Sequence, residues 1–177
     1  MGMTGVARTR SAPWLPGLAV LILTACTAAP DSPEAQVRAL LSRAESAAEK
    51  RDVGAFKELI SEGYTDEQGQ DRQALAGLLT YYFLRHQTIH LFTRIQSIDV
   101  ADAKNIDVAD AESAEPESAR ASILVAMAGT PILVVDDLER LRADLYHFDF
   151  DLVREDDDEW RVSRAAWSRA TRSHFLP

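Results

Sequence analysis

Apolar residues recur at three- and four-residue spacing through the segment that follows Ser32. This is the period of one face of an α-helix, and Asp31 or Ser32 as the cap, with Pro33 in the first turn, is typical of a helix start. Asp52 and Asp71 hold the same capping position before two further stripes, and Gly63 is placed to end the second one. The pattern predicts three helices. Their apolar stripes are Val37, Leu40, Leu41, Ala44, Ala47 and Ala48, then Val53, Phe56, Leu59 and Ile60, then Leu75, Leu78, Leu79, Tyr82 and Phe83.

From Ile89 onward the hydrophobic period changes to that of β-strands. Residues 89–100, 119–128, 143–155 and 160–170 are the predicted strands, because each mixes β-branched, aromatic and polar residues. Residues 131–142 predict a short helical crossing. Residues 64–70 predict a polar connection. The third strand alternates most clearly, with Tyr146, Phe148, Phe150 and Leu152 on one face and His147, Asp149 and Asp151 on the other.

Three helices followed by a run of antiparallel strands predict an α+β domain whose helices cover one face of the sheet. In this frame the apolar face of the third strand turns toward the helices. The face that carries His147 and Asp149 then turns outward.

The order of elements, and a final hairpin with Phe148-Asp149-Phe150, Trp160-Arg161-Val162 and a later Trp167, resembles the nuclear transport factor 2-like superfamily. That superfamily includes ketosteroid-isomerase-like and SnoaL-like proteins, and the resemblance covers residues 33–170. It implies a cone-shaped fold, in which about three helices pack on a curved antiparallel sheet and a pocket lies at the open end. The residues expected to line such a pocket are Tyr82, Phe83, Tyr146, Phe148 and Trp167; the same aromatics would also serve as core.

The net charge limits the classes of partner that the domain can bind. The chain carries 19 Lys and Arg against 28 Asp and Glu, a net charge of −9, which disfavours binding to nucleic acid or to anionic lipid head groups. Residues 101–118 hold six acidic residues against a single lysine. They predict an acidic loop that joins the first two strands.

Residues 1–25 have the parts of a secretory signal peptide. Arg8 and Arg10 are their only charges, and an apolar run from Trp14 to Ala25 follows. This run is interrupted by Pro16, and it is shorter than the roughly 20 apolar residues that a membrane-spanning helix needs. We therefore expect a removable signal and not a permanent span.

The end of that segment, Leu23-Thr24-Ala25-Cys26, resembles the bacterial lipobox. The resemblance implies cleavage after residue 25, lipidation of Cys26, a tether over residues 26–32 and a domain over residues 33–177. Cys26 is the only cysteine, so its use for lipid leaves no disulfide and no thiol nucleophile. Thr27 follows in place of an Asp, which by the same resemblance implies the periplasmic face of the outer membrane.

The sequence indicates no cofactor site, metal site or catalytic residue. His147 and Asp149 could pair on one strand face, but an outward pair is more often a solvated one. His86 and His90 have a zinc-ligand spacing if helical, but Thr88 and Ile89 indicate that the helix has already ended. No phosphate-binding glycine loop and no nucleophile elbow is present.

Three functions remain open at this point. The first is a non-catalytic, lipid-anchored envelope module that binds a small apolar ligand or a partner protein. The second is a small-molecule enzyme of isomerase or dehydratase type, which would need an ionisable side chain buried in the pocket. The third is a structural module that forms a homodimer across the outer sheet face, where His147, Asp149 and Arg161 could pair.

Overall fold

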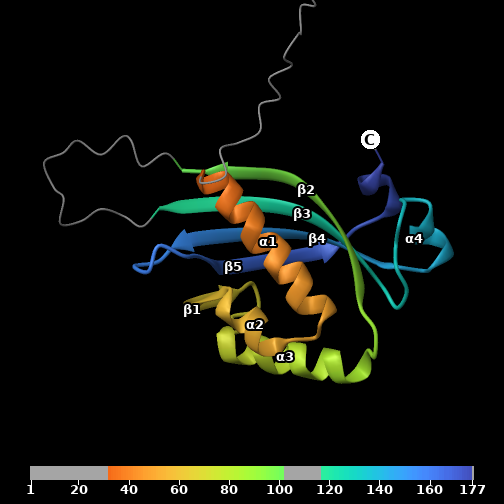
Figure 1. Ribbon diagram of the computed structural model, residues 1–177, viewed down its shortest axis with the longest axis horizontal. Helices are drawn as coiled ribbons and strands as arrows, with labels where there is room; N and C mark the ends of the chain where they lie inside the picture. The colour runs from red at the N-terminus through yellow and green to blue at the C-terminus, as the bar shows by residue number, and fades with distance from the viewer. Residues whose placement is uncertain (1–31, 102–116, 177) are drawn as a thin grey trace, which may run out of the picture.

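The computed structural model describes residues 32–101 and 117–176 (Figure 1). The predicted signal peptide, Cys26 with most of its tether, and residues 102–116 of the predicted acidic loop lie outside the described residues. The elements in chain order are α1 (Pro33–Glu49), α2 (Val53–Glu58), β1 (Ile60–Asp66), α3 (Arg72–Arg85), β2 (His90–Val100), β3 (Ser118–Ala128), α4 (Asp137–Arg140), β4 (Asp144–Arg154), β5 (Trp160–Arg169) and the short 3-10 helix η3 (Arg172–Phe175).

The three predicted helix starts are confirmed. The side chains of Ser32, Asp52 and Asp71 each accept a hydrogen bond from the backbone N–H three residues further on, at 3.2, 2.9 and 2.8 Å. Each bond satisfies one of the N–H groups that a helix start leaves without an internal partner. The second helix ends at Glu58 and not near Gly63, because the chain enters a strand at Ile60.

The sheet has five strands in the order β1-β5-β4-β3-β2. The four predicted strands pair antiparallel, as expected. The fifth strand, β1, pairs parallel with β5, so the sheet is mixed and the expected all-antiparallel sheet needs this correction. The expected polar connection over residues 64–70 is also wrong for its first part, since Tyr64 is a buried residue of β1.

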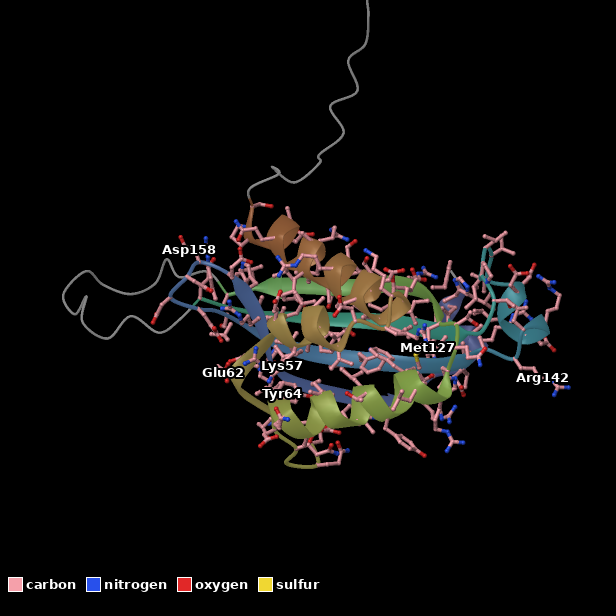
Figure 2. The ribbon with its side chains drawn as sticks, turned by 60° about the horizontal axis from the view of Figure 1, so that its bottom comes forward. Lys57, Glu62, Tyr64, Met127, Arg142 and Asp158 are labelled. Atoms are coloured by element: carbon pink, nitrogen blue, oxygen red, sulfur yellow. The ribbon has the colours of Figure 1, made fainter. Side chains whose placement is uncertain are left out.

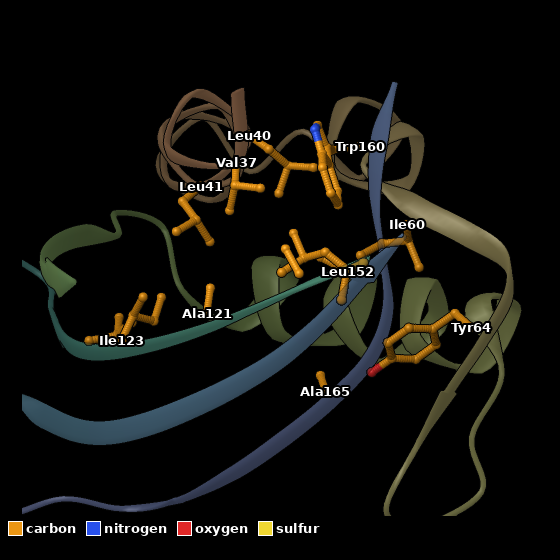
Figure 3. Close-up of a cluster of buried hydrophobic side chains, with 13 residues drawn as sticks. Val37, Leu40, Leu41, Ile60, Tyr64, Ala121, Ile123, Leu152, Trp160 and Ala165 are labelled. Atoms are coloured by element: carbon orange, nitrogen blue, oxygen red, sulfur yellow. The ribbon is translucent and has the colours of Figure 1, made fainter. Parts of the chain in front are cut away.

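The main core lies between α1 and the face of the sheet that the first three helices cover, which we call the inner face (Figures 1 and 3). Val37 and Leu40 of α1 point toward Leu152 of β4. The indole N–H of Trp160 donates to the side-chain oxygen of Gln36 at 3.0 Å, which ties β5 to α1. The buried residues of this core are Val37, Leu40, Leu41, Ile60, Tyr64, Ala119, Ala121, Ile123, Val125, Leu152, Trp160, Val162 and Ala165.

A second hydrophobic cluster covers part of the opposite, outer face. Leu124 and Ala126 of β3 pack there against Ile132, Leu138 of α4 and Phe175 of η3. Phe175 is completely buried. The predicted helical crossing is thus confirmed as α4, and it forms part of this cover together with the C-terminal turn.

Candidate functional site

Four aromatic rings lie side by side on the inner face, on β4 and β5. The ring centroid of Phe148 lies 6.0 Å from that of Tyr146, 5.7 Å from that of Phe150 and 6.5 Å from that of Trp167. We call these four residues the aromatic row. All four are only half-buried. The predicted facing of β4 is confirmed, since Phe148 and Phe150 pack against the main core.

Helix α3 supplies the other two predicted pocket residues, and they differ. Phe83 is buried, at 7% exposure, and belongs to the packing of the helix. Tyr82 is half-buried, and its ring stacks on that of His86 at 4.2 Å. Burial raises the pKa of the Tyr82 hydroxyl, and the nearby Asp144 and Tyr146 raise it further. The start of β4 and the C-terminal half of α3 therefore come close together.

Figure 2 shows α3 alongside β4 and β5, with Tyr64 near the start of the helix and Met127 near its other end. Of the five predicted pocket residues, Tyr82 lies near Asp144 and Tyr146 at the start of β4, and Tyr146, Phe148 and Trp167 belong to the aromatic row. Phe83 contributes to packing.

An ion pair between Arg169 and Asp144 lies next to Tyr146, at one end of the aromatic row. We call this end the rim. The guanidinium of Arg169 lies 5.0 Å from the centre of the Tyr146 ring and 2.8 Å from the carboxylate of Asp144. A hydrogen bond from Arg169 to Asp144 raises the pKa of the guanidinium. Because the two charges neutralise each other, this rim adds no net charge to the aromatic row.

The buried acids of the described residues hold turns. Asp66 is 5% exposed, and its carboxylate accepts the backbone N–H groups of Gln68 and Gln70 at 2.9 and 2.8 Å. Asp137 is 8% exposed and pairs with Arg140 at 2.5 Å. The hydrogen bond from Arg140 is the main cause that lowers the pKa of Asp137. Both carboxylates therefore have structural roles: one oxygen of Asp66 accepts both N–H groups, and Asp137 is bound to Arg140.

The His147–Asp149 pair lies on the outer face, as predicted. The Nε2 atom of His147 lies 2.7 Å from the Ser122 hydroxyl and 3.6 Å from the Asp149 carboxylate. In a Ser-His-Asp triad the serine and the carboxylate bind opposite nitrogens of the ring, so that a proton can pass through the imidazole. Here both contacts use the same nitrogen, so the three residues cannot act as a triad.

The two histidines with a zinc-ligand spacing lie on different secondary-structure elements. His86 caps the end of α3 and His90 begins β2, so the two do not share a helix. Within residues 32–101 and 117–176, no group of three or more His, Cys, Asp or Glu is arranged to hold a metal ion. Within one chain, the guanidinium of Arg161 binds Glu155 at 2.6 Å and Asp157 at 2.5 Å.

An open groove of about 530 Å³ lies between the end of α1, the start of α2 and β5. It is lined mainly by charged residues of both signs, among them Arg43, Lys50, Glu58, Glu159 and Arg161. The N–H groups of Arg161 already bind Glu58, Glu155 and Asp157. A ligand that needs this guanidinium would have to displace those partners.

In the part of the chain that the structure describes, no helix is long and apolar enough to cross a membrane.

No family model matches the sequence, and no curated protein matches it. Solved structures do share its fold. A ketosteroid isomerase-like protein from Erwinia carotovora atroseptica has a TM-score of 0.50 at 13% identity, over 80% of this chain and 98% of that one. ActVI-ORFA from Streptomyces coelicolor has a TM-score of 0.52 at 11% identity, over 76% and 92%.

Bd1075 from Bdellovibrio bacteriovorus has a TM-score of 0.52 at 9% identity; the match covers 76% of this chain and 40% of that one. This chain therefore spans well under half the length of Bd1075. At such identities the likeness concerns the fold. The α+β cone of the nuclear transport factor 2-like superfamily, expected from the sequence, is the fold of this chain.

The predicted pocket set omits two inner-face residues, Phe150 and Tyr64. Phe150 continues the aromatic row, and its place follows from the alternation of β4. Tyr64 is 3% exposed on β1, a strand that the sequence pattern did not predict. Its neighbours Glu62 and Asp66 share its parity along the strand, so no apolar alternation marks the segment.

Proposed function

We propose that this chain is a lipid-anchored, non-catalytic binding module of the bacterial cell envelope, and that the inner face of its cone binds a small, flat, apolar ligand. The observation that carries the proposal is the aromatic row. The rings of Tyr146, Phe150 and Trp167 lie 6.0, 5.7 and 6.5 Å from that of Phe148, yet all four remain half-buried. Aromatic side chains that retain exposure beside an apolar core are typical of small-molecule sites.

The hydrogen bonds of the two buried acids favour binding over catalysis. A carboxylate that acts as a base in an apolar pocket must be free to accept a proton. The two buried acids of the described residues, Asp66 and Asp137, instead accept hydrogen bonds that hold turns. The phenol of Tyr82 stays protonated, since its pKa is raised.

The proposal includes the orientation of the domain on its anchor. Cys26 as the lipidated residue would leave a short tether before α1. In Figure 1 the start of α1 lies at the end of the sheet where β4 finishes, and Asp144 begins β4 at the opposite end. The rim formed by Asp144 and Arg169 would then point away from the membrane. We place the module at the periplasmic face of the outer membrane, on the lipobox and Thr27.

Fluorescence titration with N-phenyl-1-naphthylamine, a neutral apolar probe, tests the binding site. The protein for this test is the full chain with Cys26→Ser, which cannot be acylated. We expect binding that Trp167→Ala weakens about tenfold, the loss of roughly 1.4 kcal/mol of ring contact. The matched control is Ser168→Ala, which removes an exposed side chain next in sequence, and it should leave the affinity unchanged.

Equal affinity of Trp167→Ala and the parent chain would place the ligand elsewhere, with the charged groove as the next site to examine. Apolar compounds captured from a periplasmic extract then test catalysis. They should be recovered with unchanged mass and chromatographic retention after incubation with the protein. A change in either property would favour the isomerase or dehydratase alternative.

A further inference from the structure

Helix α3 has apolar residues on two faces. On the inner side, Leu75 packs against the main core and Phe83 is buried. On the outer side, Leu78, Tyr81 and Leu84 are 46, 58 and 80% exposed. A helix that is hydrophobic all round is expected to be buried, yet Figures 1 and 2 show α3 at one edge of the described domain. Within residues 32–101 and 117–176, no element covers this outer side.

The exposed residues of this side form one stripe along the helix. We call it the outer stripe; it consists of Ala74, Gly77, Leu78, Tyr81 and Leu84, which recur at the three- and four-residue spacing of one helix face. It holds three of the six large hydrophobic residues that are exposed in the described chain, so it is a patch and not a set of isolated side chains. Its small residues lie in the N-terminal half and its large ones in the C-terminal half.

The glycine of the stripe, Gly77, has no structural reason within one copy of the domain. A Cβ atom placed on it meets nothing within 4 Å among the described residues, and its φ angle is not in the left-handed region. Alanine would therefore fit, and it would make the helix more stable, because glycine is a poor residue for a helix interior. A glycine on an exposed helix face also lets another chain approach closely. Gly77 thus leaves a notch that a side chain from a second copy can fill.

We propose that the outer stripe of α3 is an interface between two copies of this chain, which meet as an antiparallel helix pair with two-fold symmetry. With the pair centred between Gly77 and Leu78, each Leu78 lies over the Gly77 of the second copy. Each Tyr81 then lies beside the Ala74 of the second copy. Large residues meet small ones, so the stripe is complementary to itself, as a two-fold interface requires. The inference does not depend on a bound ligand and goes beyond the proposed function.

The charges at the two ends of α3 favour the antiparallel orientation. Arg85 is exposed near the C-terminal end, where its guanidinium donates to the Tyr81 hydroxyl at 2.7 Å. Asp71, the cap, is exposed at the N-terminal end, whereas the neighbouring Arg72 is 17% exposed and bound to Glu62. An antiparallel pair brings each Arg85 near the Asp71 of the second copy, and a parallel pair would bring like charges together. Such exposed pairs add little affinity, but they select the orientation.

Sedimentation equilibrium on the full chain with Cys26→Ser tests the interface. We expect a dimer, and we expect Tyr81→Glu to weaken its association at least about tenfold, because it places an unpaired carboxylate in the apolar stripe. The matched control is Leu133→Glu, which puts the same charge on an apolar residue that is 79% exposed outside α3. This control should leave the association constant unchanged. The urea midpoint of each variant shows whether the fold is retained.

Disulfide formation tests the geometry of the pair. In the chain with Cys26→Ser, an introduced cysteine is the only thiol. Leu78→Cys lies at the two-fold axis and should form a covalent dimer on mild oxidation. Leu84→Cys should not, because the antiparallel pair holds its two copies about 20 Å apart along the helix. Random collision would favour the opposite result, since Leu84 is the more exposed residue. A mixture of Ala74→Cys and Tyr81→Cys should form the mixed dimer in preference to either symmetric one.

Three results would overturn the inference. The first is a parent chain that stays monomeric at every concentration reached. The second is a dimer that Asp149→Arg dissociates and Tyr81→Glu leaves intact, which would place the interface on the outer face of the sheet. The third is equal disulfide formation by Leu78→Cys and Leu84→Cys, which would reject the antiparallel register. If Tyr81→Glu fails to fold, the cysteine variants decide the question alone.

Discussion

The facing of β4 gives the sharpest test of the fold, because neighbouring residues should respond in opposite ways. Phe148 points to the inner face and touches three other aromatic rings. Asp149 points outward with a 60% exposed side chain, whose carboxylate lies 3.6 Å from His147. The substitutions Phe148→Ala and Asp149→Ala therefore affect neighbouring residues that lie on opposite faces of the sheet.

The magnitudes follow from burial. Truncation of a fully buried phenylalanine costs about 3–5 kcal/mol. Phe148 is half-buried, so part of its ring gains little from folding, and we expect a cost of about 2–3 kcal/mol. Asp149→Ala removes an exposed side chain whose one ionic contact is long, and it should cost less than about 0.5 kcal/mol.

Urea denaturation followed by far-ultraviolet circular dichroism measures both values. Circular dichroism is preferable to fluorescence here, because Phe148 touches Trp167 and its loss would change the emission of that residue. An unchanged slope with urea in both variants would justify the comparison of free energies. A nearly neutral Phe148→Ala together with a severe Asp149→Ala would refute the facing. It would also return His147 and Asp149 to the pocket as catalytic residues.

Three further predictions concern other parts of the chain. Cys26→Ala should abolish incorporation of a labelled fatty acid in cells, since no other thiol can accept the lipid; label that persists on this variant would end the lipoprotein assignment. The hydrogen bond from Arg161 lowers the pKa of Asp157 from 3.8 to about 2. The parent chain should therefore lose stability relative to Asp157→Asn as the pH falls from about 4 toward 2, and parallel pH profiles would contradict this. Phe175→Ala should cost about 3–5 kcal/mol in urea denaturation, because the ring is fully buried against the outer face; a neutral result would mean that the C-terminal turn does not contribute to the core.

Local signals account for the elements that the sequence predicted. The capping residues Asp52 and Asp71 act on N–H groups three residues away, so their effect is visible in a short window. The alternation from Tyr146 to Leu152 is equally local. It gave both the strand and its inner face, and from that facing the outward position of His147 followed.

β1 depends on contacts far away in the sequence. Its parallel partner, β5, begins at Trp160, almost one hundred residues later. The register also shifts between Ile60 and Thr65, so the buried positions do not keep a period of two. No short window shows such a strand. Tyr64 was missed for this reason, although it is among the most buried aromatic residues of the domain.

The sequence of β3 indicates that part of the outer face is covered, and the strand prediction did not use this indication. Residues 123–126 of β3 are apolar without a break, and all four are buried, at 7, 4, 7 and 0% exposure. A strand with one solvent-exposed face should alternate apolar and polar residues, whereas an unbroken apolar run is typical of a strand covered on both faces. Leu124 and Ala126 therefore already required something to pack outside the sheet, and α4 with η3 supplies it. A homodimer across the outer face, if it forms, would have to use the polar half around Ser122 and Asp149. Exchange of Asp149→Arg would then weaken the dimer in analytical ultracentrifugation without changing the fold, while an unchanged association constant would exclude that surface.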